Sequence, residues 1–327
     1  MPDQGYVNGA AQPAPMLSRF AITATTPPEN FMANLILPDA QTDTFLGKAP
    51  VRGNEELEVD DDDLIGNKTD FPQVMWSEGE TAWELGMHGR RATIGALSIE
   101  RARQAQRAAG SGGDPMYDLE TRVTGILVAQ NLRRTELLKW RVILDETIYP
   151  AENVLDPIEI DTTSILRETL ITASEIVEAQ GQGAANLILF GRGALRGADR
   201  NANLLDLLPE TSPQVLTRGL IRTLTQLPEE STRVEFASSV YRSTPGGPLI
   251  PMMDNHIWVG RVKAAPDGKA AFGWTYWMNC MENGKRVYMN RLLLGNQETR
   301  SIGLKNYYLP SPEDTSLGVL IPTTFSA

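Results

Sequence analysis

The stretch DPMYDLETRVTGILVAQNLRRTELLKWRVILDETIYP, residues 114–150, predicts one helix that is much longer than any other element of the chain. Asp114 and Pro115 form a good N-cap and first-turn pair, and Pro150 ends the helical pattern after about Ile148. At 1.5 Å per residue, a helix of some 30 residues extends about 45 Å, which exceeds the width of a small globular domain. The pattern therefore predicts a protein organised along a helical spine.

One face of this helix is expected to be apolar and the other faces charged. The apolar residues recur at helical spacing and are Leu119, Val123, Ile126, Leu127, Leu137, Leu138, Val142 and Ile143. The cationic residues expected on the other faces are Arg122, Arg133, Arg134, Lys139 and Arg141. This division predicts that the spine packs along one stripe and turns its cations away from the core.

The chain after the spine predicts an α+β fold. Helices are expected at about 163–180 and 212–227, with a buried strand at 184–190 between them. Strand patterns then follow in a late run, at 232–242, 256–262, 271–279, 286–296, 301–309 and 318–325. This order is typical of α+β proteins and places the spine against a sheet formed late in the chain.

The residues before the spine predict little core of their own. Residues 1–28 are poor in charge and rich in Pro, Gly, Ala and Gln, which is typical of an extended arm. From Phe45 to about Ile94 the pattern predicts a long polar hairpin, and SIERARQAQRAA (98–109) predicts a short helix. An excursion of about 50 residues is unusual inside a compact domain and normally makes contact with something else.

Charge is distributed unevenly along this excursion. The chain carries 30 basic and 41 acidic residues, a net charge of −11, which disfavours a protein whose main task is to bind nucleic-acid phosphates. Residues 55–84 hold eleven acids against Lys68, whereas residues 85–107 hold five arginines against Glu100. The order suggests complementary contacts between segments or copies, with solvated faces as the alternative. The contact candidates are Glu55, Glu56, Glu58, Asp60, Asp61, Asp62, Asp63, Arg90, Arg91, Arg133 and Arg134.

Residues that carry catalysis are scarce, so we predict no enzyme, no cofactor and no metal site. His88 and His256 are far apart in sequence, and the single cysteine, Cys280, has no obvious local partner. GRGALRG (191–197) follows a strand and precedes a helix, as in dinucleotide sites, but its spacing is GxGxxxG. A nucleotide-dependent enzyme is therefore only a minor alternative. A cluster of aromatic residues at strand spacing could stack on nucleic-acid bases, but packing in the sheet is the favoured interpretation. These residues are Trp258, Trp274, Tyr276 and Trp277.

Taken in order, these segments resemble the major capsid proteins of tailed bacteriophages, the family with the Hong Kong 97-type fold. FMANLILPDAQTDTFLGKAP (31–50) resembles the family's apolar turn, Leu-x-Pro and short strand after an N-terminal arm. The stretch 114–150 resembles its spine helix, with a Tyr-containing first turn and an Asn midway. QGQGAANLILFGRGALRG (180–197) resembles the Gly-rich turn, strand and short helix of its axial domain. RVEFASSVYR followed by DNHIWVGRV resembles the strands that return to its peripheral domain.

The resemblance implies an architecture in five parts. An N-terminal arm would span 1–40 and an extended loop 41–97. The spine helix and the first part of the peripheral domain would span 98–160. The axial domain would span 161–254, and the return strands of the peripheral domain with the C-terminal segment would span 255–327.

The resemblance also implies a function. It predicts a subunit that self-assembles into pentamers and hexamers of an icosahedral shell around double-stranded DNA, in the virion and, before assembly, in the host cytoplasm. The implied partners are identical copies together with portal, scaffolding and cement or decoration proteins, whereas DNA would be contacted only non-specifically and a membrane not at all. An encapsulin-like compartment shell, which shares the fold and encloses cargo enzymes, is the alternative. Neighbouring copies would supply the contacts that the arm, the excursion and the over-long helix lack.

Overall fold

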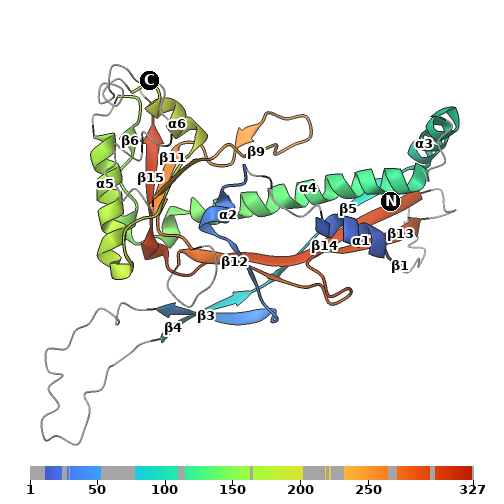
Figure 1. Ribbon diagram of the computed structural model, residues 1–327, viewed down its shortest axis with the longest axis horizontal. Helices are drawn as coiled ribbons and strands as arrows, with labels where there is room; N and C mark the ends of the chain where they lie inside the picture. The colour runs from blue at the N-terminus through green and yellow to red at the C-terminus, as the bar shows by residue number, and fades with distance from the viewer. Residues whose placement is uncertain are drawn as a thin grey trace, which may run out of the picture.

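The computed structural model shows an elongated subunit in which one long helix, α4 (Pro115–Ile143), runs along a large sheet and ends against a second sheet (Figure 1). The structure describes residues 12–23, 28, 30–52, 78–109, 115–162, 165–201, 218, 221, 232–263, 271–294 and 299–325. Helices pack on the faces of sheets whose strands are mostly antiparallel, so the predicted α+β class is confirmed.

The larger sheet has six strands, which come from residues 12–94 and from residues 273–312. Its order is β1–β13–β14–β12–β2, and β5 also pairs with β14. The strands are β1 (Gln12–Pro13), β2 (Asp39–Gln41), β5 (Gly86–Ile94), β12 (Gly273–Met278), β13 (Tyr288–Leu294) and β14 (Thr299–Pro312). Buried apolar residues of this sheet pack against α4, α1 (Pro15–Thr23) and α3 (Ala96–Ala109).

The second sheet has five strands in the order β6–β15–β11–β7–β8. The strands are β6 (Ile158–Glu159), β7 (Leu187–Phe190), β8 (Arg233–Phe236), β11 (His256–Gly260) and β15 (Gly318–Thr324). One face packs against α5 (Leu166–Val177), which continues into a π-helical turn (Glu178–Gln182), and against α6 (Arg192–Ala198). The other face meets the C-terminal end of α4 and the short helix α2 (Ala33–Ile36). This sheet is thus covered on both faces.

Strands of the last segment divide between the two sheets. We expected residues 255–327 to return together to one domain, but β11 pairs with β7 and β15, whereas β12, β13 and β14 belong to the larger sheet. The physical reason lies in burial: β7 and most of β11 and β15 are continuous buried runs, as expected for central strands of a sheet covered on both faces. Such runs predict a strand without indicating its partner.

The buried stripe of α4 differs from the predicted one. Ile126, expected in the core, is 51 % exposed, whereas Lys139, expected on a solvent face, is only 1 % exposed. The prediction for Lys139 was wrong because cations are rarely fully buried unless they are paired, and its partners are distant in sequence. The stripe in fact contains five buried polar residues: Glu120, Thr124, Asn131, Glu136 and Lys139.

Two hairpins project from this framework. Among the described strands, β3 (Leu46–Arg52) and β4 (Glu78–Glu84) pair only with each other, and they lie on the side of the larger sheet away from α4 (Figure 1). The much shorter pair β9 (Val240–Tyr241) and β10 (Ile250–Pro251) lies near α2 and α4. Single 3-10 turns span Glu146–Ile148, Ala151–Asn153 and Thr315–Leu317. Within the described ranges, no helix is both long and apolar enough to cross a bilayer.

Candidate contact surface

Four arginines from three separate elements surround one groove on the surface of the subunit. Arg90 comes from β5, Arg133 and Arg134 come from α4, and Arg242 comes from the β9–β10 hairpin. The groove has a volume of about 670 Å³, and all four side chains are exposed. The rest of its lining is uncharged and consists of Gln130, Leu137, Val240, Tyr241, Ser243, Thr244, Pro245, Gly246 and Leu249. We call this set of residues the arginine groove.

Helix and strand periodicity explain why these side chains converge. Gln130, Arg133, Arg134 and Leu137 are spaced by three or four residues and therefore share one face of α4. On β5, alternate side chains point to opposite faces, and Arg90 shares its face with Ala92 and Ile94, which pack in the core beneath α4. The Arg90 guanidinium accordingly donates to Gln130 Oε1 of α4 at 3.1 Å.

The charged residues that line the groove are all positive among those that the structure describes. Next to the groove, the His88 ring stacks on Tyr308 with 4.0 Å between the ring centroids. Burial lowers the pKa of His88, the hydrogen bond with Tyr308 O partly offsets this, and the nearby charge of Arg134 lowers the pKa further. The four arginines therefore place positive charge around one groove of an acidic chain.

The structure groups some of the predicted contact residues and separates others. Arg90, Arg133 and Arg134 lie around the groove, whereas Arg91 is exposed on the opposite face of β5. Arg242 was not predicted, because it lies in a loop after a short strand and no periodicity connects it to the spine. The acidic candidates lie outside the described residues; they are Glu55, Glu56, Glu58, Asp60, Asp61, Asp62 and Asp63.

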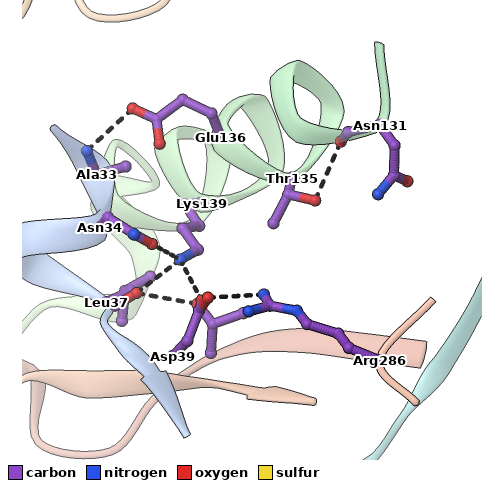
Figure 2. Close-up of polar contacts among 10 residues, drawn as sticks. Ala33, Asn34, Leu37, Asp39, Asn131, Thr135, Glu136, Lys139 and Arg286 are labelled. Atoms are coloured by element: carbon purple, nitrogen blue, oxygen red, sulfur yellow. Dashed lines mark hydrogen bonds and ion pairs between the residues drawn. The ribbon is translucent and has the colours of Figure 1, made fainter. Parts of the chain in front are cut away.

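A buried polar network ties the start of the chain to the spine helix (Figure 2). Lys139 Nζ donates to Leu37 O at 2.9 Å and to Asp39 Oδ1 at 2.9 Å, and it also contacts Asn34 Oδ1. The second carboxylate oxygen of Asp39 accepts from Arg286 at 2.6 Å. Burial alone would raise the pKa of Asp39, but the charges of Lys139 and Arg286 outweigh it and hold that pKa below its usual value. The network therefore contains an ion pair between Lys139 and Asp39 next to α2, in which burial lowers the pKa of Lys139 and the charge of Asp39 opposes that shift.

Glu136 lies one turn before Lys139 and has a different electrostatic state. Its Oε1 accepts from Ala33 N at 3.0 Å and from Trp140 Nε1 at 2.9 Å, while the residue is only 3 % exposed. Burial raises the pKa of Glu136 from 4.5 to about 7, because these hydrogen bonds and Lys139 only partly offset the loss of hydration. Glu136 is thus a buried carboxyl group whose charge changes near neutral pH.

This shifted pKa predicts a pH-dependent stability. The folded chain keeps a proton on Glu136 that the unfolded chain releases above pH 4.5, so this contribution is complete below pH 4.5 and is lost as the pH rises through 7. Glu136→Gln keeps an oxygen that accepts both hydrogen bonds and removes the titration. Between pH 5 and pH 8, its free energy of unfolding relative to the wild type is expected to rise by about 1 to 3 kcal/mol.

Urea unfolding of the unassembled chain at the two pH values measures this difference. The matched control is Glu152→Gln, because Glu152 is exposed and the substitution changes the same functional group. Parallel pH profiles for the wild type and Glu136→Gln would show that Glu136 is ionised in the folded chain throughout.

A second buried acid anchors the other end of the spine. Glu120 is 1 % exposed, and its two carboxylate oxygens accept from Arg291 of β13 and from Arg300 of β14, the latter at 2.8 Å. The charges are paired, as a buried carboxylate requires. Polar residues therefore hold α4 to the larger sheet near both of its ends.

The glycines of GRGALRG serve packing in this structure. A Cβ at Gly191 would lie 2.1 Å from Asp254 O, and one at Gly193 would lie 2.1 Å from Asn255 Oδ1. Protein atoms, including a carboxylate of Asp254, thus occupy the space over the turn in which a dinucleotide would place its phosphates. The arrangement gives no support to the nucleotide alternative.

Comparison with known proteins gives a clear result only at the level of structure. No family model and no curated protein matches the sequence. A phage-related protein from Bordetella bronchiseptica RB50 matches with a TM-score of 0.68 and 17 % identity, over 95 % of this chain and 97 % of that one. The capsid protein assigned to a prophage of E. coli CFT073 matches with a TM-score of 0.55 and 13 % identity, over 96 % and 99 %. A virus-like particle from Pyrococcus furiosus matches with a TM-score of 0.52 and 9 % identity, over 94 % and 98 %. Over nearly its full length, the chain therefore has the fold of phage capsid proteins, the Hong Kong 97-like fold.

Proposed function

We propose that this chain is the major capsid protein of a tailed bacteriophage, a structural subunit and not an enzyme. The observation that carries the proposal is a fold shared over 95 % of the chain with a phage-related protein and over 96 % with a prophage capsid protein. The projecting hairpin supports it, because β3 and β4 form a separate two-stranded sheet within the described part of the chain and Leu46 remains 67 % exposed. Contacts with neighbouring copies would cover such a surface.

The parts of the fold take roles in this proposal. The five-stranded sheet with α5 and α6 would form most of the axial domain, although β11 and β15 come from beyond residue 254. The larger sheet with α4 would form the peripheral domain, and the β3–β4 hairpin would carry the extended loop. Repeated head-to-tail contacts between such subunits generate closed rings, so we propose pentamers and hexamers as the building units of the shell.

The charge of the chain fits a container for DNA more than a DNA-binding protein. With a net charge of −11, most of the subunit would repel phosphates, so packaged DNA would be held without sequence recognition. Portal, scaffolding and cement or decoration proteins are the further partners we propose, with assembly in the host cytoplasm and residence in the virion. These assignments follow from the proposed role.

Negative-stain electron microscopy of the expressed protein tests this function. We expect rings or closed shells, either from the chain alone or on co-expression with the proteins encoded beside it, because the subunit buries its projections only between copies. Shells that contain protein cargo in place of DNA would favour the encapsulin-like alternative. A chain that remains monomeric under all of these conditions would contradict the proposal.

A further inference from the structure

Resting on the proposed function, we propose that the arginine groove is the binding site for the acidic segment of a neighbouring copy. The acidic segment is residues 55–63, EELEVDDDD, which holds seven carboxylates in nine residues. The proposal names both sides of one contact between subunits: a positive groove on the first copy and residues 55–63 of the second.

Charge complementarity is the first argument. Four arginines line a groove without an acidic lining residue in the part of the chain that the structure describes, although acids outnumber bases by 41 to 30 overall. The planar guanidinium group matches a carboxylate with two parallel hydrogen bonds, so arginine suits carboxylate recognition better than lysine does. A concentrated acidic stretch is therefore the chemistry that the groove fits.

The composition of the groove is the second argument. Leu137 and Leu249 lie among the arginines, and Leu249 is 57 % exposed. The acidic segment likewise carries two apolar residues, Leu57 and Val59, spaced by two between its acids. In an extended bound peptide, residues spaced by two share one face, so both could cover Leu249 while the acids meet the arginines. A volume of about 670 Å³ accommodates a short stretch of this kind.

The position of the β3–β4 hairpin argues for a contact between copies. The acidic segment belongs to the connection that leaves β3 at Arg52 and returns to β4 at Glu78. Figure 1 places this hairpin on one side of the larger sheet, and α4 with the β9–β10 hairpin on the other side. The described strands β3 and β4, from which the acidic segment continues, therefore lie across the sheet from the groove of their own subunit, and we assign the contact to the groove of a second copy.

The pre-positioning of Arg90 makes the groove specific. Its hydrogen bond to Gln130 fixes the side chain against α4, which lowers the entropy lost when a carboxylate binds. Arg91, the next residue, is equally charged and exposed but lies on the other face of β5. Arg91 therefore provides a control of the same charge: the proposal assigns the contact to the groove face and gives Arg91 no part in it.

A peptide-binding experiment tests the groove on the full, unassembled chain. The probe is a fluorescent synthetic peptide of residues 53–65, and binding is followed by fluorescence anisotropy. Arg133→Glu with Arg242→Glu should weaken binding by about tenfold or more, because two attractive contacts become repulsive, whereas Arg91→Glu should change it by less than about twofold. Raising the salt concentration should weaken binding to the wild type. Equal effects of the two changes would overturn the proposal, as would absence of binding to the wild type.

Two further measurements are needed. The first distinguishes a contact within one subunit from a contact between copies, and the second distinguishes failure of this contact from failure of the proposed shell function. A chain with Asp60 to Asp63 changed to Asn should bind the peptide as the wild type does; tighter binding by about tenfold would show that the segment occupies the groove of its own subunit. In shells or rings, Arg133→Glu with Arg242→Glu should reduce assembly and Arg91→Glu should not. Normal assembly of the groove variant would overturn this contact and leave the proposed shell function intact.

Discussion

Replacing Lys139 by methionine is expected to lower the free energy of unfolding by about 3 to 5 kcal/mol, because removal of one partner of a buried ion pair strands the other. Lys139 is 1 % exposed and supplies the donors that reach Leu37 O and Asp39 Oδ1 (Figure 2). Methionine has a similar length but no donor, so the carbonyl and the carboxylate would lose their partner inside the protein. Arg286 would still hold the other oxygen of Asp39, which keeps the loss at the lower end of this range.

Urea unfolding of the unassembled variant measures this loss. Lys285→Met is the matched control, because Lys285 is exposed and its replacement should change stability by no more than about 0.5 kcal/mol. In an Asp39→Asn background the same change at Lys139 should have a smaller effect, since less charge is left uncompensated. If Lys139→Met were as stable as Lys285→Met, the network would contribute nothing to holding α2 and β2 on the spine.

The spine and the fold class could be predicted because their signals are local. Asp114, Pro115 and Pro150 bound the helix, and α4 indeed begins at Pro115, although it ends at Ile143 and a 3-10 turn follows. The order of the segments then sufficed for the resemblance to capsid proteins. The sheet that β11 and β15 join could not be predicted in this way. Strands that are buried on both faces lack the alternation of polar and apolar residues that would indicate which neighbour they pair with.

The contact surface could be predicted only in part. Arg90, Arg133 and Arg134 are visible as a basic stretch, and strand alternation alone separates Arg91 from Arg90. Arg242 joins them through folding of a loop about 100 residues away, which no pattern in the chain indicates. Lys139 illustrates the same limit in the core: it lies four residues before the buried Ile143, but its own burial depends on Asp39, whose position only the folded structure reveals.

Trp258→Ala is expected to be similarly damaging, with a loss of about 3 to 5 kcal/mol in the free energy of unfolding. Trp258 of β11 is fully buried and packs edge-to-face on Phe272 with 5.4 Å between the ring centroids. Its Nε1 donates to Tyr149 Oη at 3.2 Å, and Tyr149 Oη in turn donates to Ile143 O at the end of α4. Trp258 thus joins the five-stranded sheet to the spine and to the residues that lead into β12, so alanine would open a cavity where three elements meet.

Trp258→Phe separates the two contributions in the same urea experiment. Phenylalanine keeps most of the apolar contact with Phe272 and removes the indole N–H, so a loss of about 1 to 2 kcal/mol is expected from the hydrogen bond and the smaller ring. Since Tyr149 Oη would still donate to Ile143 O, the end of α4 should stay attached in this variant. Equal losses for the two variants would mean that the hydrogen bond, and not the packing of the ring, connects the sheet to the spine.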